Sequence, residues 1–218
     1  MKLSILIANF NRAEFISRAI RSCIHQIVFR KPYEIIVIDD CSTDNSVDVI
    51  SEFQNEIRFI KNHSNLGIAK TSNIGLDISD AEYWMRVDSD DFISEFAVSF
   101  MINILESNAD IDFVYTDHLR IDIDGNTIDH IRLDTNEKLY EHGAGIMFRK
   151  KILDEINGYD ESLHNAEDYD LLIRLIKNGK RGFYLPVPLY RYYMHDDNLT
   201  KRFDRKYFVN KVKDKYEI

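Results

Sequence analysis

Short apolar runs alternate with helix-like segments through the first half of the chain. The segments KLSILIA (2–8) and YEIIVID (33–39) are almost continuously apolar, as expected for strands that are buried on both faces. Between them, apolar residues recur at helical spacing: Ile16, Ala19, Ile20, Cys23, Ile24 and Ile27. This spacing predicts an amphipathic helix of about four turns, and Asn11 with Glu14 predicts a capping box at its start. Strands that alternate with helices indicate an α/β fold with a mostly parallel sheet.

The same alternation continues to residue 88, and the second half is less regular. After CSTDNS (41–46) we expect a helix, a strand over 57–61, a helix over about 67–78 and a strand that ends at Asp88. Further on we expect a hairpin over 112–133, a strand near 145–149, a helix over 167–178, an aromatic strand within 181–195 and a closing helix over 201–216. The hairpin turns at Asp124-Gly125-Asn126, a common turn sequence. We find no repeat or linker and predict a single domain.

The composition is that of a globular protein with an acidic surface. Of the 218 residues, 44% are hydrophobic and 30% are charged, which suffices for one well-formed core. The formal net charge is −9, which argues against a nucleic-acid partner. An acidic protein that binds a phosphorylated ligand must supply positive charge locally.

Cysteine use and the N-terminus predict a cytoplasmic protein. The only cysteines, Cys23 and Cys41, have no CxxC spacing and suit a reducing compartment. The start, MKLSILIANFNR, is too short for the apolar part of a signal peptide. No apolar run approaches the ~18 residues of a membrane span. Peripheral contact with the inner face of a membrane and homo-oligomerisation stay open.

Polar side chains directly follow three of the predicted strands. They are Asn9 and Asn11 after the first strand, Asp39 and Asp40 after the second, and Asp88, Asp90 and Asp91 after the fourth. Any one of them could be a turn residue, because Asp and Asn favour turns. Open α/β sheets bind ligands beyond the carboxyl ends of their strands. Polar residues at three strand ends together therefore favour a binding site.

The DSDD run at 88–91 is costly unless a cation neutralises it, because carboxylates within about 4–6 Å of each other repel. The first strand is followed by ANFNRAEF, which lacks the dinucleotide-binding glycines, and Ser64 and Ala69 replace the two P-loop glycines. Phe92 and Ile93 stand where an EF-hand needs a ligand and a glycine. What remains is Mn²⁺ or Mg²⁺ held by a few carboxylates and by substrate phosphates.

Two further segments carry candidate functional side chains. In NAEDYDLLIRLIKNG (165–179), Asp168 shares the apolar face of the predicted helix with leucines at i+3, i+4 and i+7. It either interacts with the helix dipole or faces a cleft, where it could act as a general base. His195 ends the aromatic strand and is a candidate metal ligand, although a lone histidine is more often structural. Arg191 and Lys201 are candidate phosphate contacts.

In their order and spacing, these segments resemble the family 2 glycosyltransferases of GT-A fold. The matching segments are ILIANFNR, IIVIDDCSTDNS, NLGIAKTSNIGL, MRVDSDD, GIMFRKKIL, AEDYDLLIRL and YRYYMH, and they span residues 2–196. The resemblance implies a Rossmann-like α/β fold, with a mixed, mostly parallel central sheet flanked by helices in one domain over 1–218. It also implies a nucleotide-sugar-binding half at about 1–91 and an acceptor-binding and catalytic half at about 92–200. Beyond the matching segments, we expect a helical tail at 201–218.

The resemblance further implies roles for individual residues. A nucleotide-sugar donor, most often a UDP-sugar, would contact Ala8, Asn9, Phe10, Asn11, Asp39, Asp40, Lys70, Asn73, Asp88 and Ser89. The DSDD run matches the family's DxD motif, so Asp90 and Asp91, with His195, would hold Mn²⁺ or Mg²⁺ against the diphosphate. Asp168 matches the base that deprotonates an acceptor hydroxyl. The implied chemistry is an inverting, single displacement at the anomeric carbon.

The chain departs from the family's usual pattern in three places. Ala8 and Asn9 stand where proline and threonine are usual, and Ser72 stands where the glycine-rich loop usually carries an arginine. Lys70 or Arg86 is the candidate replacement for that arginine. The Q-x-x-R-W signature of processive synthases is absent, so we expect one transfer per encounter.

The resemblance implies transfer to a glycan, glycolipid or similar acceptor, as in cell-surface polysaccharide synthesis. Two alternatives stay open: a non-catalytic nucleotide-sugar-binding subunit of a glycan-assembly complex, and a sugar-phosphate nucleotidyltransferase. The nucleotidyltransferase is disfavoured because its basic, glycine-rich loop after the first strand is missing here. We expect the segment 134–165, with His142, His164 and Asn165, to discriminate among donors.

Overall fold

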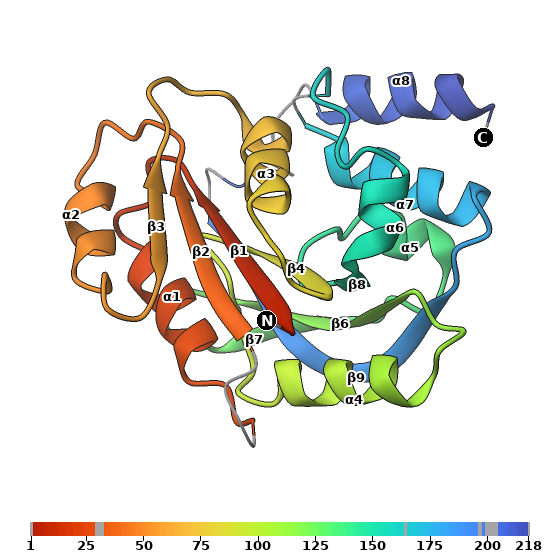
Figure 1. Cartoon of the computed structure of the whole chain (residues 1–218), viewed down its shortest axis with the longest axis horizontal. Coiled ribbons are helices and arrows are strands. Elements are labelled where there is room, and N and C mark those ends of the chain that lie inside the picture. Colours follow the sequence, from red (N-terminus) through yellow and green to blue (C-terminus); the bar gives the residue numbers. More distant parts are fainter. Residues whose placement is uncertain (1, 29–32, 164, 196–197, 199–204, 218) are drawn as a thin grey trace.

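A computed structural model of the chain describes residues 2–28, 33–163, 165–195, 198 and 205–217. The elements of Figure 1 are, in chain order, β1 (Leu3–Asn9), α1 (Ile16–Ile24), β2 (Tyr33–Asp39), α2 (Ser46–Ser51), β3 (Arg58–Lys61), α3 (Ile68–Asp77), β4 (Tyr83–Asp88), β5 (Phe92–Ile93), α4 (Ala97–Ser107), β6 (Phe113–Ile121), β7 (Thr127–Ile131), α5 (Asn136–Tyr140), β8 (Met147–Arg149), α6 (Lys150–Glu155), α7 (Glu167–Lys177), β9 (Gly182–Tyr193) and α8 (Arg205–Tyr216).

Within these residues, the strands form one mixed sheet. Its order is β3-β2-β1-β4-β8-β6-β9-β5, with β7 paired to β6. The strands β3, β2, β1 and β4 are parallel, whereas β8 runs antiparallel to β4 and β6. The long strand β9 pairs with β6 in parallel and lies across the base of the molecule in Figure 1. The predicted α/β architecture, with a mostly parallel sheet in a single domain, is confirmed.

Alternate residues of β1 enter two separate cores. Ile5 and Ile7 pack in a cluster with the apolar faces of α1 and α4, whereas Leu6 packs in a cluster with α3, α6 and α7. Successive side chains of a strand point to opposite faces. Helices on both faces therefore explain why β1 reads as a continuous apolar run.

Two local predictions about α1 are wrong. The helix ends at Ile24, and Ile27, predicted to lie on its apolar stripe, is 55% exposed because its N–H donates to the Glu95 carbonyl instead. No capping box forms at the start of α1, which begins after Phe15 with no side-chain cap. Asn11 instead adopts a φ of 52°, and its Oδ1 accepts a hydrogen bond from the Thr43 amide. Asn11 therefore braces two loops rather than a helix.

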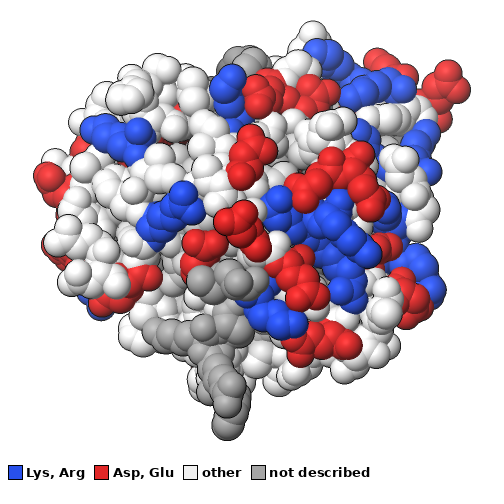
Figure 2. Space-filling view, in the orientation of Figure 1, with Lys and Arg blue, Asp and Glu red and all other residues white. Residues whose placement is uncertain are grey.

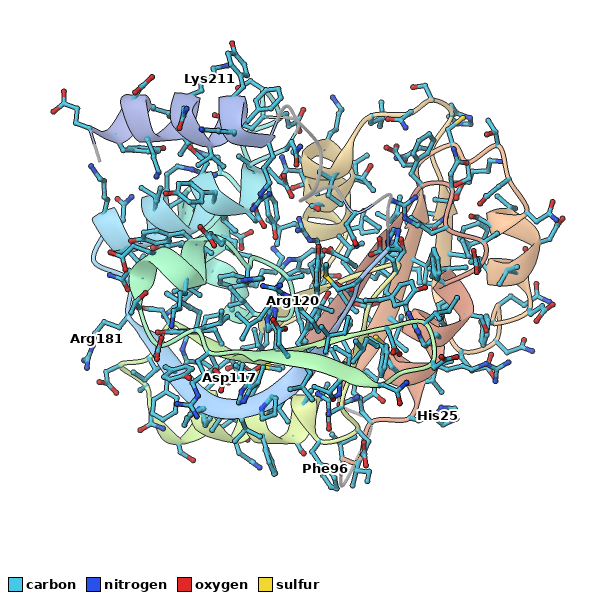
Figure 3. The ribbon with its side chains drawn as sticks, turned by 180° about the vertical axis from the view of Figure 1, so that it is seen from behind. His25, Phe96, Asp117, Arg120, Arg181 and Lys211 are labelled. Carbon is cyan, nitrogen blue, oxygen red and sulfur yellow. The ribbon has the colours of Figure 1, made fainter. Side chains whose placement is uncertain are left out.

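The predicted hairpin is confirmed as β6 and β7, which pair antiparallel. Beneath it, the buried Asp117 carboxylate accepts hydrogen bonds from the Tyr184 hydroxyl at 2.6 Å and the Leu133 amide at 3.1 Å, and lies 2.8 Å from His130 Nε2. Figure 3 shows Asp117 near the base of the molecule, where β6 and β9 run side by side. One buried carboxylate thus fastens the hairpin to β9.

Charges of both signs are interspersed on the face shown in Figure 2. Lys and Arg side chains gather to the right of its centre, over the region of α6, with Asp and Glu around them. Exposed ion pairs, such as Arg181–Asp110 at 2.6 Å, contribute little to stability. In the described part of the chain, no helix is both long and apolar enough to cross a membrane.

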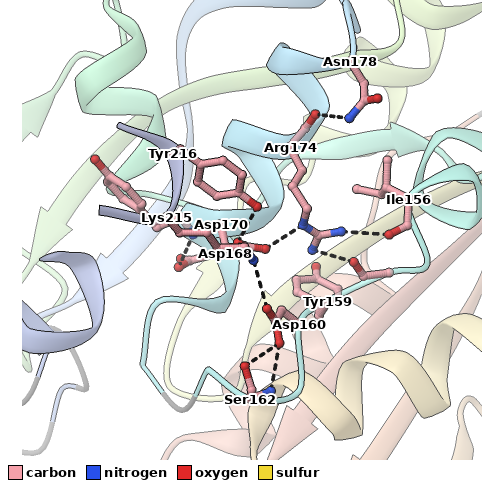
Figure 4. A network of polar contacts seen from close by, with 12 residues as sticks. Ile156, Tyr159, Asp160, Ser162, Asp168, Asp170, Arg174, Asn178, Lys215 and Tyr216 are labelled. Atoms are coloured by element: carbon pink, nitrogen blue, oxygen red, sulfur yellow. Dashed lines mark hydrogen bonds and ion pairs between the residues drawn. The ribbon is translucent and has the colours of Figure 1, made fainter. Parts of the chain in front are cut away.

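A buried carboxylate also holds the C-terminal helix α8 against α7 (Figure 4). The side chain of Asp170 is 0% exposed and accepts hydrogen bonds from Arg174 Nε at 2.6 Å, Lys215 Nζ at 2.9 Å and the Tyr216 hydroxyl at 2.9 Å. Arg174 in turn donates to the carbonyl of Gly158 at 2.7 Å. We call this set of contacts the Asp170 clip.

The Asp170 clip predicts that replacing a buried acid lowers the free energy of unfolding far more than replacing an exposed acid. Removing one partner of a buried ion pair costs about 3 kcal/mol or more, so Asp170→Asn should lower the free energy of unfolding by that amount. Urea denaturation followed by circular dichroism measures the change. Asp154→Asn, which removes an exposed partner of Lys150, is the matched control and should change stability by less than about 0.5 kcal/mol. Equal effects of the two substitutions would contradict the clip.

Candidate functional site

A cleft opens at the carboxyl ends of β1, β2 and β4, where Figure 1 places α3 and α7 on either side. Its volume is about 280 Å³, near the lower end of the roughly 300–1,000 Å³ typical of small-molecule sites. The residues predicted as functional that line it are Ala8, Asn9, Phe10, Asp40, Asp88, Ser89, Asp90 and Asp168. The structure therefore brings residues from both halves of the chain to one place.

Other predicted residues lie outside the cleft lining: Asn11, Asp39, Lys70, Asn73, Asp91 and His195. Asp39 is fully buried and accepts hydrogen bonds from Asn9 Nδ2 at 2.9 Å and the Ser42 amide at 2.9 Å. It therefore fixes the turn behind Asn9. Of the two neighbouring acids, it is Asp40 that reaches the cleft.

The Asp40 carboxylate shapes the loop that forms the cleft wall. Its Oδ1 accepts hydrogen bonds from Asn62 Nδ2 at 2.8 Å and the Leu66 amide at 2.9 Å, and its Oδ2 accepts one from the Gly67 amide at 2.8 Å. Gly67 has a φ of 83°, which favours glycine at this turn into α3. This part of the wall is thus preformed.

Lys70 and Asn73, predicted as donor contacts, both engage the loop before α7 in this structure. Lys70 pairs with Glu161 at 3.3 Å. Asn73 exchanges two hydrogen bonds with the backbone of Tyr159, donating at 2.9 Å and accepting at 2.8 Å. These side chains join α3 to the loop that precedes α7.

The last acid of the DSDD run, Asp91, turns away from the cleft. It is 1% exposed, and its carboxylate accepts hydrogen bonds from the Tyr190 hydroxyl at 2.7 Å and the Tyr193 amide at 2.8 Å. Burial and the neighbouring acids raise the pKa of Asp91 well above its ordinary value. The prediction of Asp91 as a metal ligand therefore does not fit this structure; the side chain anchors β9 beneath the site.

Asp90 faces the cleft and stays ionised. Its Oδ2 accepts a hydrogen bond from Arg12 Nε at 3.2 Å and lies 3.0 Å from His195 Nε2. Burial alone would raise the pKa of Asp90, but the contact with His195 and the charge of Arg12 hold it below its ordinary value. The His195 ring stacks on both Phe15 and Tyr193, which also contact each other. His195 therefore contacts the site through Asp90.

Arg86 joins Asp88, at the end of β4, to Glu167, at the start of α7. Its guanidinium is 4% exposed and lies 3.2 Å from Asp88 Oδ1 and 3.1 Å from Glu167 Oε1. Burial, with the nearby Asp90 and Asp168 carboxylates, raises the pKa of Asp88, and Arg86 opposes this shift. Burial likewise raises the pKa of Glu167 to about 7. Arg86 is thus the internal cation that makes this concentration of acids tolerable.

Asp168, at the start of α7, lies across the cleft from β1. Its Oδ1 accepts a hydrogen bond from the Tyr169 amide at 2.8 Å, and its Oδ2 accepts one from the Gly143 amide at 3.2 Å. A Cβ atom at position 143 would lie 2.1 Å from the Cβ of Asp168. Glycine at 143 is therefore required for this placement of the carboxylate.

The sequence analysis missed several residues that line the cleft, namely Arg12, Glu167, Tyr192, Asn198 and Arg205, and it missed Gly143, whose amide holds Asp168. Arg12 directly follows the ANFN segment, and Glu167 precedes Asp168, so both were within reach of motif reasoning. Of the residues proposed to discriminate donors, Asn165 lines the cleft. His164 and Lys201 lie outside the described residues. Arg191 donates to the Pro188 carbonyl and is not in the cleft lining.

Two cleft carboxylates could hold a divalent cation. In the residues that the structure describes, no three His, Cys, Asp or Glu side chains form a ready-made ligand set. Asp88 and Asp90 nevertheless both line the cleft, and carboxylate oxygens are what Mn²⁺ and Mg²⁺ prefer. Magnesium sites often use one or two carboxylates and take their remaining oxygens from substrate phosphates and water. Asp88 and Asp90 therefore fit the predicted cation, without Asp91.

The sequence matches a family model described as Glycosyl transferase family 2 over residues 4–159. The chain belongs to this family. A second model, described as Glycosyltransferase like family 2, matches residues 131–215. The family predicted from the sequence motifs is confirmed.

Curated members of the family share moderate identity with the chain. The chondroitin synthase of Escherichia coli is 30% identical over 188 residues, which cover 81% of this chain and 27% of that protein. The poly(ribitol-phosphate) beta-N-acetylglucosaminyltransferase TarP of Staphylococcus aureus is 37% identical over 114 residues, which cover 50% of this chain and 35% of TarP. The chain thus spans about a quarter to a third of the length of these relatives.

Solved structures show the same fold. A crystal structure of S. aureus TarS 1-349 in complex with UDP-GlcNAc matches 97% of this chain and 65% of that chain, with a TM-score of 0.81 and 19% identity. The mannosyltransferase PcManGT from Pyrobaculum calidifontis, in complex with GDP-Man and Mn²⁺, matches 99% of this chain and 64% of that chain, with a TM-score of 0.81 and 15% identity. These likenesses confirm the GT-A fold.

The burial of His142 predicts a measurable pH dependence of stability. His142 directly precedes Gly143, whose amide donates to Asp168. Burial lowers the pKa of His142 to about 4; Asp168 opposes the shift, and Arg120 and Arg205 add to it. Between about pH 4 and the ordinary histidine pKa of about 6.5, the unfolded chain therefore binds a proton that the folded chain does not. The contribution of His142 to stability should therefore rise with pH across this window, by about 3 kcal/mol at most. Glu167, whose pKa burial raises to about 7, contributes in the opposite sense, so the His142 contribution is isolated by comparison with a His142 variant.

Urea denaturation at several pH values between 4 and 7 tests this. In His142→Asn the rise in stability across the window should be smaller than in the unchanged protein, because the variant has lost the group that titrates. His63→Asn, at an exposed position, is the control and should retain the full rise. The same pH dependence in all three proteins would contradict the assignment.

Proposed function

We propose that this chain transfers a sugar from a nucleotide sugar, with a UDP-sugar as the expected donor, to a hydroxyl group of a glycan, glycolipid or similar acceptor. The observation that carries the proposal is the convergence of Asp88, Asp90 and Asp168 on one cleft at the carboxyl edge of a GT-A sheet. The names of the relatives, which include polysaccharide synthases, and the UDP-sugar complex of TarS support it. Synthesis of a surface polysaccharide is the expected setting.

The donor would lie along the wall built by residues 1–91. Ala8, Asn9 and Phe10 end β1 there, and Asp40 holds the loop that faces them. The nucleoside fits between these segments, which places the diphosphate beside Asp88 and Asp90. When bound there, Mn²⁺ or Mg²⁺ would neutralise the diphosphate leaving group. Arg12 and His195 would keep Asp90 ionised and oriented for the cation.

The acceptor would enter on the side built by residues 92–200, where Asp168 is the proposed base. Two backbone amides hold its carboxylate in place, and Glu167 is already paired with Arg86. Asp168 can therefore take the proton of an acceptor hydroxyl as that oxygen attacks the anomeric carbon. One base and a direct displacement invert the anomeric configuration.

Two substitutions separate donor binding from chemistry. A thermal-shift screen of UDP, GDP, UDP-GlcNAc and UDP-glucose, each with and without Mn²⁺, should show a Mn²⁺-dependent rise in Tm for at least one nucleotide. Asp90→Asn should abolish this rise. Asp168→Asn should keep it but lower the rate of nucleoside diphosphate release by about 10²–10⁴-fold, the usual contribution of a general base.

The matched control is Asp110→Asn, at an exposed acid that pairs with Arg181 outside the cleft. It should behave like the unchanged protein in both measurements. A Mn²⁺-dependent rise in Tm with no turnover on any acceptor would instead support a nucleotide-sugar-binding subunit. Release of pyrophosphate from a nucleoside triphosphate would support a nucleotidyltransferase.

Gly143→Ala should act specifically on the base. The added methyl group collides with Asp168, so the carboxylate must move, and an error of about 1 Å in a reacting group can cost 10²-fold in rate. We expect turnover to fall by about that factor while the Mn²⁺-dependent nucleotide Tm shift is retained. Gly125→Ala, whose Cβ meets nothing within 4 Å but whose φ of +83° strains any side chain, is the control for backbone strain away from the cleft; its Tm should fall while its turnover is retained. Full turnover in Gly143→Ala would show that the position of Asp168 is not critical.

A further inference from the structure

One arginine lines the cleft near α7, and a second lies on the neighbouring strand β6. Arg205, the first residue of α8, and Tyr192 of β9 both line the cleft. The edge of the Tyr192 ring meets His142, with ring centroids 6.4 Å apart. Arg120 of β6 lies opposite Tyr192 in the strand register, and Figure 3 shows it on the other side of the β6 ribbon from Asp117. We call Arg120, His142, Tyr192 and Arg205 the basic strip.

The basic strip is held beside the proposed base. Arg205 Nη2 donates to the Glu141 carbonyl at 3.3 Å, and two residues later the Gly143 amide donates to Asp168. The same short turn thus contacts Arg205 on one side and Asp168 on the other. The Asp170 clip fixes α8 against α7 (Figure 4), and so fixes the helix that begins with Arg205.

The charges of the strip are available to a ligand. Arg120 pairs with Asp129 at 3.4 Å, but both side chains are exposed, and such pairs are weak in water. The contact from Arg205 to Glu141 is to a neutral carbonyl oxygen. Both arginines help to lower the pKa of His142, which shows that their positive potential reaches the space between them. This potential is local, since the whole chain carries a net charge of −9.

We propose that the basic strip binds a carboxylate or phosphate group of the acceptor, so that the acceptor is an acidic glycan or a glycan phosphate. This inference rests on the proposed function and narrows its acceptor class. An anion that approaches Asp168 is repelled unless a cation lies nearby, and Arg120 and Arg205 supply that charge on the acceptor side. Arginine suits the task because its planar fork of donors matches carboxylate and phosphate oxygens.

Calorimetry on the full chain tests the proposal by measuring the affinity for two pairs of probes. Each pair contains one anionic compound and its neutral counterpart. The first pair is p-nitrophenyl β-D-glucuronide and p-nitrophenyl β-D-glucoside, and the second is glucose 6-phosphate and glucose. Each titration is run with and without UDP and Mn²⁺. We expect the unchanged protein to bind at least one anionic probe about tenfold more tightly than its neutral partner, since one charge-assisted contact is worth about a factor of ten.

Variants of the strip should remove this preference without removing the fold. Arg205→Gln and Arg120→Gln should each reduce it severalfold, the double variant should abolish it, and Arg205→Lys should keep part of it. Arg181→Gln, at an exposed arginine outside the cleft, should leave it intact. The Tm of each variant checks folding. Absence of any preference in the unchanged protein, or its survival in the double variant, overturns the proposal.

The donor diphosphate is the other anion that could use Arg205, and the same experiment separates the two. If Arg205→Gln weakens UDP binding about tenfold and leaves the preference for the anionic probe unchanged, Arg205 serves the donor and the acceptor assignment is wrong. If the unchanged protein shows no Mn²⁺-dependent UDP binding but still prefers the anionic probe, the proposed function fails while the anion site stands. The two failures are therefore distinguishable.

Discussion

The acids at the end of β4 and directly after it are tolerated because each one has a partner. Asp88 pairs with Arg86, Asp90 contacts Arg12 and His195, and Asp91 is bound by two groups of β9. Buried carboxylates without such partners would cost several kcal/mol each. The cleft can therefore concentrate negative charge at one edge of the sheet without unfolding it.

These partners also connect the two sides of the cleft. Arg86 leaves β4 and reaches both Asp88 and Glu167, so the proposed cation site and the start of α7 share one guanidinium. Glu167 directly precedes Asp168, which lines the cleft. Donor and acceptor chemistry would thus be aligned through one buried side chain, and the arginines of the basic strip would complete the site.

The sequence was sufficient for features that depend on local pattern. Continuous apolar runs predicted the parallel strands, and the spacing of leucines from Asp168 led to the expectation that this acid faces a cleft, which it lines. The sequence was insufficient where the partner of a side chain lies on a distant segment of the chain. The partners of Asp91 lie 99 and 102 positions away on β9, and Asn73 is engaged by a backbone 86 positions away. Arg205 belongs to no motif. It reaches the cleft only because α8 packs against α7.

The most direct test is a crystal structure with Mn²⁺ and UDP, using anomalous diffraction at the manganese edge. The account predicts one manganese peak between the Asp88 and Asp90 carboxylates and the diphosphate oxygens, with Asp91 still bound to Tyr190. UDP bound in the cleft with no manganese between the two carboxylates, or manganese held by Asp91, would contradict it.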